Sequence, residues 1–213
     1  MMIAIIDYKA GNLKSVERAL NSLGFPCRIT HEKEEILNAD RIIFPGVGAA
    51  GSAISDLRDL GLDKVLKEAF KRDKPVLGIC MGAQIILGWS EENQTQCLGL
   101  IKGEARRFPS PLLSDKGERL KIPHMGWNGV RLTRTHPVLK DMQQVDEFYF
   151  VHSYYPLPSS SENVLGTTDY GMNFPSIIGC KNLIATQFHP EKSGPPGLKI
   201  LENFCSWSGQ DAE

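Results

Sequence analysis

Residues 75–87 read Pro-Val-Leu-Gly-Ile-Cys-Met-Gly-Ala-Gln-Ile-Ile-Leu and contain an apolar run, short enough for a buried strand, that ends at Cys80. Gly78 and Gly82 stand two residues before and two residues after this cysteine. The spacing indicates a nucleophile elbow, a sharp strand-turn-helix connection whose flanking glycines remove side chains that would collide with the nucleophile. A helix beginning at Cys80 would favour the thiolate through its unpaired N–H groups. The alternative is a buried apolar cysteine, and the two glycines favour the elbow.

Strand and helix patterns alternate in the chain before the elbow. Short apolar runs indicate buried strands, and apolar residues three or four apart indicate one-sided helices. Asn12 is a candidate N-cap for the first helix, and Gly24 ends that helix. This alternation predicts right-handed crossovers and a doubly wound α/β fold with helices on both faces of a parallel sheet. The expected strands cover 2–7, 25–30, 41–44 and the run to Cys80, and the expected helices cover 13–23, 32–38, 50–58 and 62–72.

The chain after residue 103 has a different character. Short strand-like runs are broken by Pro, Gly, Asp and Ser, so this half is expected to add an antiparallel strand region to the mostly parallel or mixed central sheet. A last helix is expected after residues 193–196, and residues 156–161 are expected to form an exposed loop. One domain is expected to cover residues 1–213. The strand-like runs are 104–108, 120–122, 147–151, 163–168, 176–180 and 183–188.

The composition is that of a soluble globular protein, with 41% hydrophobic and 23% charged residues among 213. The 24 basic and 25 acidic residues nearly cancel, so no basic field indicates nucleic acid or an anionic membrane as a partner. No apolar run is long enough for a bilayer span and the start of the chain lacks a signal-peptide pattern, so we expect a cytoplasmic protein. Five cysteines without a Cys-x-x-Cys pair favour reduced thiols and argue against structural zinc.

A thiol nucleophile needs a base that accepts its proton and later returns one to the leaving group, and histidine suits both roles near neutral pH. His31 and His136 lie in polar, turn-like surroundings and are expected at the surface. His124 is a further candidate. His152 and His189 follow strand-like runs, where α/β proteins place functional side chains, so these two are the leading candidates. A structural role is the alternative for each of them.

Glu191 favours His189 as the base. A carboxylate two residues from a histidine can accept the second ring N–H, which fixes the tautomer and stabilises the imidazolium as the third member of a catalytic triad does. Residues two apart share one face of a strand, and Pro190 then turns the chain. The pattern makes a His189–Glu191 pair feasible and leaves its geometry open.

Pro45, Gly46, Val47 and Gly48 follow the third expected strand. Glycines at this point would let backbone N–H groups approach a substrate or an oxyanion closely. A tight turn is the alternative, and neither a GxGxxG nor a Walker A pattern is present to indicate a nucleotide. Combined with a cysteine elbow, the segment is a candidate part of an oxyanion hole.

Three segments together give a more specific indication than any one of them. Residues 78–84, 45–48 and 187–191 resemble motifs of the class I (triad) glutamine amidotransferases. Within this family the chain is similar to the members that work with a (β/α)8-barrel cyclase subunit of the histidine pathway. The resemblance runs essentially from end to end, with further support from residues 5–13, 123–128, 148–154 and 188–194.

The resemblance implies a role for each matching residue. Cys80 would attack the side-chain amide of glutamine, His189 would act as general base and acid, and Glu191 would orient His189. The thioester on Cys80 would then be hydrolysed to glutamate, with release of ammonia and without any cofactor or metal. Residues 45–48 would border the oxyanion. The positions implied in substrate binding are Gly46, Gly48, Gln84, Glu92, Ser153 and Tyr154.

The resemblance also implies a heterodimer with the cyclase subunit, which would use the ammonia on a phosphoribulosyl-formimino carboxamide ribotide. Trp127, Asn128 and Tyr149 would lie at the interface. Free hydrolysis by the isolated subunit would waste ammonia, so low activity alone and stimulation by the partner are expected. Three alternatives stay open: an ammonia donor in surface-sugar biosynthesis, a related Cys-His hydrolase such as a γ-glutamyl hydrolase-like protein, and a non-catalytic binding subunit.

Overall fold

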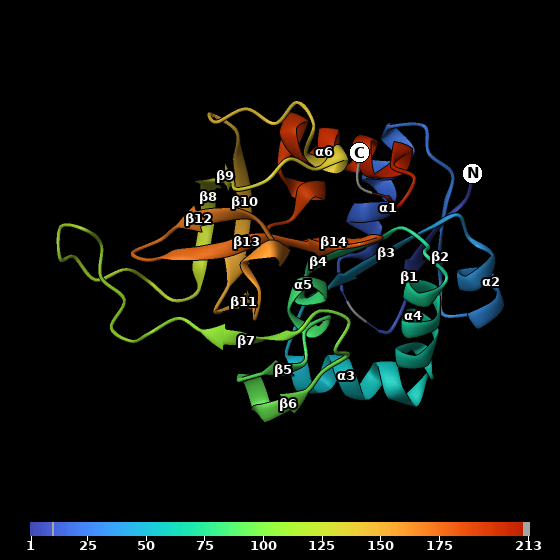
Figure 1. Cartoon of the computed structure of the whole chain (residues 1–213), viewed down its shortest axis with the longest axis horizontal. Coiled ribbons are helices and arrows are strands. Elements are labelled where there is room, and N and C mark those ends of the chain that lie inside the picture. Colours follow the sequence, from blue (N-terminus) through green and yellow to red (C-terminus); the bar gives the residue numbers. More distant parts are fainter. Residues whose placement is uncertain (10, 211–213) are drawn as a thin grey trace.

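The computed structural model describes residues 1–9 and 11–210. Ala10, which belongs to the 5–13 stretch of the resemblance, and residues 211–213 lie outside the described residues. A central sheet of eight strands, in the order β2-β1-β3-β4-β14-β13-β12-β9, runs through the molecule (Figure 1). No helix in the described part of the chain is long and apolar enough to cross a membrane.

The first half of the chain builds the parallel part of this sheet. Strands β1, β2, β3 and β4 and the later strand β14 all pair in parallel, and helices connect them as the alternating pattern predicts. The predicted doubly wound α/β class is therefore confirmed. The elements are β1 (Ile3–Ile6), α1 (Leu13–Ser22), β2 (Cys27–Thr30), α2 (Lys33–Asn38), β3 (Arg41–Gly46), α3 (Ala50–Asp59), α4 (Leu62–Lys71), β4 (Val76–Cys80) and α5 (Met81–Ile85).

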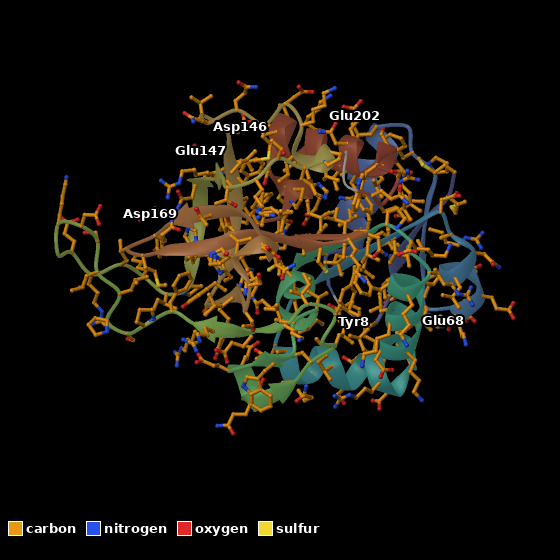
Figure 2. The ribbon with its side chains drawn as sticks, in the orientation of Figure 1. Tyr8, Glu68, Asp146, Glu147, Asp169 and Glu202 are labelled. Atoms are coloured by element: carbon orange, nitrogen blue, oxygen red, sulfur yellow. The ribbon has the colours of Figure 1, made fainter. Side chains whose placement is uncertain are left out.

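Helices cover both faces of the sheet, and strand β1 shows how (Figure 1). Alternate residues of a strand point to opposite faces. Ile3 and Ile5 enter the core beneath α1 and the C-terminal helix α6 (Gly194–Ser206), whereas Ala4 and Ile6 enter the core beneath α2, α3, α4 and α5. Charged side chains project outward, as Glu147 and Asp169 do in Figure 2. The continuous apolar runs of the sequence thus reflect strands that are buried on both faces.

The second half adds antiparallel strands, as predicted. β12 (Val164–Asp169), β13 (Asn173–Cys180) and β14 (Leu183–Thr186) form an antiparallel meander that joins the parallel strands through β14. Two smaller sheets lie beside it. They contain β10 (Glu147–His152) with β8 (His124–Gly129), and β11 (Tyr154–Pro158) with β7 (Gly103–Arg107), β5 (Trp89–Ser90) and β6 (Thr95–Gln96), while β9 (Arg131–Leu132) ends the central sheet.

One strand prediction and one loop prediction in this half were wrong. Residues 120–122 form no regular strand, and the neighbouring strand is β8, which lacks apolar alternation because only His124 is buried along it. The exposed loop predicted at 156–161 is a strand as far as Pro158, and Pro156 and Pro158 are buried in it. Among the described strands β11 pairs only with β7, and an edge strand tolerates prolines because one side of its backbone makes no ladder bonds.

The prediction that His136 lies at the surface was also wrong. His136 is 9% exposed, and its Nδ1 accepts a hydrogen bond from the backbone N–H of Val138 at 3.2 Å. The ring also contacts Trp207 edge to face, with centroids 4.8 Å apart. His136 is therefore buried although its sequence surroundings are polar, because Trp207 packs against its ring. His31, by contrast, is exposed as predicted.

Candidate active site

Cys80 is the last residue of β4, and α5 begins at the next residue, so the predicted strand-turn-helix connection is present. Its backbone angles, φ 54° and ψ −104°, are strained for a residue with a side chain. The flanking glycines make the turn possible. A Cβ on Gly82 would collide with the backbone oxygen of Phe44, and a Cβ on Gly78 would lie 2.9 Å from the Cβ of Ala185. The sharp turn brings the thiol to the carboxyl end of the parallel strands.

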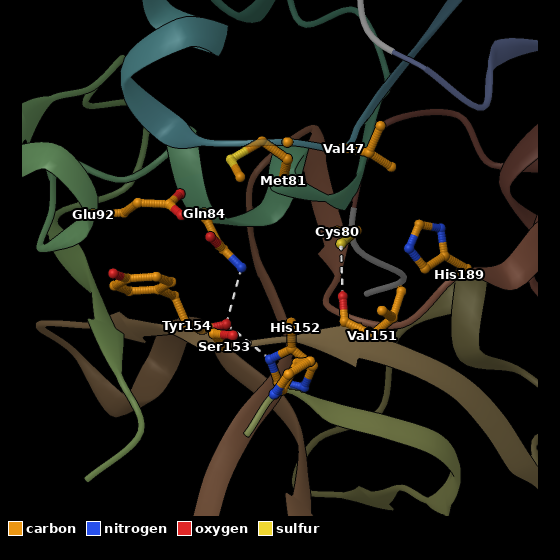
Figure 3. A pocket seen from close by; sticks show the side chains of 12 residues that line it. Val47, Cys80, Met81, Gln84, Glu92, Val151, His152, Ser153, Tyr154 and His189 are labelled. Atoms are coloured by element: carbon orange, nitrogen blue, oxygen red, sulfur yellow. Dashed lines mark hydrogen bonds between the residues drawn. The ribbon is translucent and has the colours of Figure 1, made fainter. Parts of the chain in front are cut away.

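Cys80 opens into a cavity of about 320 Å³ at this end of the sheet (Figure 3). The cavity is formed by the elbow, the segment after β3 and the chain between β10 and β11. His189 stands beside the sulfur, and Gln84 and Glu92 lie across the cavity from it (Figure 3). Most of the residues predicted to bind substrate line this cavity, namely Gly48, Gln84, Glu92, Ser153 and Tyr154.

His189 and Glu191 form the pair that the sequence made feasible. Nδ1 of His189 lies 2.8 Å from Oε1 of Glu191, and both side chains are buried. A carboxylate only accepts hydrogen bonds, so Nδ1 carries a proton in both charge states of the ring, and Nε2 is the nitrogen that can exchange a proton with a neighbouring group. Nε2 is buried and has no hydrogen-bond partner among the described residues. Burial lowers the pKa of His189, but the Cys80 thiolate and the Glu191 carboxylate favour the imidazolium enough to raise it to about 10.

Asn12 contacts the Glu191 carboxylate of this pair, and the sequence did not indicate this contact. Its side-chain amide donates a hydrogen bond to Oε1 of Glu191, the oxygen that also faces His189. Asn12 is the N-cap residue of α1, as predicted, but it adopts a left-handed conformation with φ 73° and makes no side-chain cap bond. The amide is therefore used to position the carboxylate rather than the helix.

Gln84 and Glu92 have fixed orientations. Nε2 of Gln84 donates to the backbone oxygen of Tyr154 at 2.9 Å, and the side-chain oxygen of Gln84 is buried without a partner among the described residues. Oε2 of Glu92 accepts the backbone N–H of Ala50 at 2.7 Å, at the start of α3. An acceptor oxygen and a carboxylate on one wall of the cavity suit a ligand that carries an ammonium group.

Pro45 and Gly46 end strand β3, where Gly46 pairs with Cys80, and Val47 and Gly48 leave the strand and line the cavity. A Cβ on Gly46 would collide with the Tyr8 hydroxyl, so only glycine fits there. Gly48 has φ +103°, a conformation that residues with side chains rarely adopt. The Tyr8 hydroxyl is buried, and its pKa is raised by burial and then by the nearby Cys80 and Asp56 charges.

Trp127, Asn128 and Tyr149, the predicted interface residues, lie on the two-stranded sheet of β8 and β10. Trp127 is 54% exposed and contacts the Tyr149 ring edge to face, with centroids 6.1 Å apart. The neighbouring Asn128 is partly buried, and its amide donates to the backbone oxygen of Asp169 at 2.8 Å. Tyr149 also reaches the site, because its backbone oxygen accepts the N–H of His189 at 3.0 Å.

His152, the second leading histidine candidate, lines the cavity but has no hydrogen bond to Cys80 among those of the described residues. It pairs instead with His124, with Nδ1 of His124 3.0 Å from Nε2 of His152. Burial lowers the pKa of His124 to about 4 and that of His152 to about 3. Both rings are therefore neutral at physiological pH and are weak bases, which suits a structural pair better than a group that takes a proton from a thiol.

Acyl transfer requires a nucleophile, a base with its orienting group, and a cavity for the substrate. The structure provides the Cys80 thiol on a strained turn, a buried His–Glu pair and a cavity beside them. The family model of Glutamine amidotransferase class-I matches residues 4–206. The chain belongs to the class I glutamine amidotransferase family.

Relatives within the family carry one particular name. A protein of Maridesulfovibrio salexigens named imidazole glycerol phosphate synthase subunit HisH is 52% identical over 206 residues, which are 97% of each chain. Proteins of the same name from Nitratidesulfovibrio vulgaris (strain Hildenborough) and Neisseria meningitidis serogroup B are 50% and 45% identical, covering 100% and 97% of this chain and 99% and 100% of theirs.

Solved structures share the fold. A crystal structure of a glutamine amidotransferase superimposes with a TM-score of 0.71 at 18% identity, covering 95% of this chain and 98% of the other. A chain in the structure of PurLQS from Thermotoga maritima gives the same TM-score at 17% identity, with coverage of 96% and 97%. At this level of identity the similarity concerns the fold.

Proposed function

We propose that this protein is the glutaminase subunit of imidazole glycerol phosphate synthase. The observation that carries the proposal is that Cys80 and His189 line one wall of a cavity sized for an amino acid, with Glu191 hydrogen-bonded to His189. The names of relatives 45–52% identical over nearly the whole chain favour the histidine pathway over an ammonia donor for surface sugars. In this role the chain acts as one domain in the cytoplasm.

The proposed reaction begins with the Cys80 sulfur. His189 Nε2 takes the thiol proton, and Sγ attacks the side-chain amide carbon of glutamine, so that a carbon–sulfur bond forms and the carbonyl oxygen becomes an oxyanion. The imidazolium then gives its proton to the amide nitrogen, the carbon–nitrogen bond breaks and ammonia leaves. Water, deprotonated by His189, hydrolyses the thioester, releasing glutamate and restoring the thiol.

Each proposed step uses a neighbour already described. Glu191 keeps the proton on Nδ1 of His189 and stabilises the imidazolium, with its own carboxylate held by Asn12. Backbone N–H groups of residues 46–48, after Pro45, are proposed to receive the oxyanion. The free oxygen of Gln84 and the carboxylate of Glu92 are proposed to bind the substrate ammonium, beside the backbone of Ser153 and Tyr154.

The proposed partner is a (β/α)8-barrel cyclase subunit that receives the ammonia. Trp127, exposed on β8, and Tyr149, half-buried on β10, offer an aromatic pair, and the backbone oxygen of Tyr149 also holds the N–H of His189. A partner that docks on this pair would therefore touch an element of the active site directly. This arrangement supports the proposed interface and gives a route by which a loaded partner stimulates hydrolysis.

A glutamine analogue with an electrophile in place of the amide tests the proposal. It should label Cys80 and no other cysteine, and prior addition of glutamine should slow the labelling. A chain that leaves Cys80 unlabelled would be a non-catalytic subunit. Rapid cleavage of γ-glutamyl peptides, with no response to a cyclase subunit, would instead indicate a hydrolase of another kind.

A further inference from the structure

Gln187 is a fully buried side chain that contacts the candidate nucleophile. It follows Thr186, the last residue of β14, and β14 pairs in parallel with β4 so that Thr186 stands opposite Ile79. The residues that follow these two in the chain, Gln187 and Cys80, therefore lie side by side. Nε2 of Gln187 lies 3.6 Å from Sγ of Cys80, and Gln187 is 0% exposed.

The orientation of the Gln187 amide follows from its neighbours. The backbone oxygen of Tyr154 can only accept, so the end of the Gln84 amide that lies 2.9 Å from it is the NH2 group. The same NH2 group of Gln84 also lies 3.0 Å from the side-chain amide of Gln187. An NH2 group donates, so the Gln187 atom that it meets is the oxygen Oε1. The NH2 group of Gln187 therefore points at the sulfur.

The Tyr154 oxygen is held by a second donor, and the tautomers of the two buried histidines follow from it. Nδ1 of His152 lies 2.8 Å from this oxygen and so carries the proton, which leaves Nε2 of the neutral ring as an acceptor. Nδ1 of His124, 3.0 Å away, must then be the donor. Nε2 of His124 in turn accepts from the Asn128 amide at 3.3 Å.

The bonds from Asn128 through His124 and His152 all run in one direction and end on the Tyr154 oxygen. Gln84 donates to the same oxygen from the other side and orients Gln187. A continuous hydrogen-bond network, buried except at the partly exposed Asn128, thus joins the face that carries Trp127 to the sulfur of Cys80. Buried networks of this kind hold one geometry, since any rotated amide or ring would leave a polar group unpaired.

We propose that Gln187 is a further catalytic residue, which donates an N–H hydrogen bond to the Cys80 thiolate and is held in place by this network. The inference rests on the proposed function of Cys80. A neutral amide stabilises the thiolate without competing for its proton, which leaves His189 as the base. Among the described residues, the other groups near the sulfur include His189, backed by Glu191, and the Tyr8 hydroxyl, whose pKa the Cys80 charge helps to raise. The Val151 oxygen lies 4.0 Å from the sulfur and can accept only from the protonated thiol.

Alkylation of Cys80 by iodoacetamide measures this contact without glutamine. The rate would be followed by mass spectrometry of the Cys80 peptide between pH 6 and 10. Gln187→Met keeps the length of the side chain and removes the donor, so the rate at pH 7 should fall about tenfold and recover at high pH. Gln187→Glu presents a carboxylate to the sulfur and should react more slowly still. Equal rates in all three proteins would overturn the proposal.

Asn182→Leu is the matched control. It removes another buried amide near the opposite end of β14, where Asn182 bonds the backbone oxygens of Phe70 and Lys74. The control should lose stability in a thermal melt but keep the wild-type alkylation rate. If a Gln187 variant does not fold, NMR spectra of the wild-type protein labelled with 15N-glutamine test the contact between Gln187 and Cys80. One side-chain NH2 signal should shift strongly when Cys80 is alkylated, and no shift would contradict the contact.

These outcomes separate the inference from the proposed function. A slow Gln187→Met variant in a protein that never hydrolyses glutamine would support the contact and remove the glutaminase proposal. Normal glutamine hydrolysis with equal alkylation rates in all variants would keep the glutaminase and remove the role of Gln187.

Discussion

The proposed roles of His189 and Glu191 predict how Glu191→Gln changes the pH dependence of glutamine hydrolysis. The two side chains are buried and 2.8 Å apart, so solvent screens their interaction little. The pKa of His189 reaches about 10 despite burial because the Cys80 thiolate and Glu191 both favour the imidazolium. Loss of a hydrogen bond to a charged group costs about 1.5–3 kcal/mol, or roughly one to two pKa units, in the variant.

The sign of the effect follows from the proton that leaves with ammonia. The imidazolium must donate it, so turnover is present below the pKa of His189 and is lost as pH rises through that value. A lower pKa in the variant moves this loss about one to two pH units downward. Turnover at neutral pH should also fall roughly hundredfold, because the ring loses the charged group that orients it.

The assay measures glutamate formation between pH 6 and 11 in the presence of the cyclase subunit. Glu202→Gln is the control, since Glu202 lies on the outer side of α6 and pairs with Lys199 at 2.9 Å (Figure 2). The control should keep the wild-type profile. An unchanged alkaline limb in Glu191→Gln would refute the proposed proton transfer from His189 to the leaving ammonia.

Three further predictions concern the supports of the site and its outer face. Asn12→Ala should lower kcat about tenfold with little change in KM, because the Glu191 carboxylate behind His189 loses its second hydrogen-bond donor. A tenfold rise in KM would contradict this. Gly82→Ala should lower the free energy of unfolding by about 1–3 kcal/mol in urea titrations, whereas Gly129→Ala, where a Cβ meets no atom within 4 Å, should not. Trp127→Ala should weaken cyclase binding at least tenfold by calorimetry, and Trp89→Ala, exposed elsewhere, should leave it unchanged.

The sequence predicted the parallel half of the fold well, for a physical reason. Strands buried on both faces must be apolar throughout, as in β1 and β4, and the pattern is hard to mistake. β8 escaped prediction because it presents Gly, Trp and Asn to its surroundings and buries only His124. β11 escaped prediction because its prolines indicate a loop unless the strand is known to lie at an edge.

The candidate site also contains residues that the sequence predicted and residues that it missed. Cys80, His189 and Glu191 carry local signals, a double-glycine turn and a His-x-Glu spacing, and neighbouring parallel strands then bring them to one edge. Asn12 and Gln187 carry no such signal. Their roles depend on which distant side chain lies opposite each amide, and strand register and chain crossing decide this.

Glutamine turnover by wild type and Cys80→Ala, each with and without a cyclase subunit loaded with its ribotide ligand, tests the central claim most directly. We predict slow hydrolysis by the wild-type chain on its own, strong stimulation by the loaded partner, and no hydrolysis by Cys80→Ala although the variant still binds the partner. Glutamine hydrolysis that persists in Cys80→Ala would contradict the proposed role of this thiol.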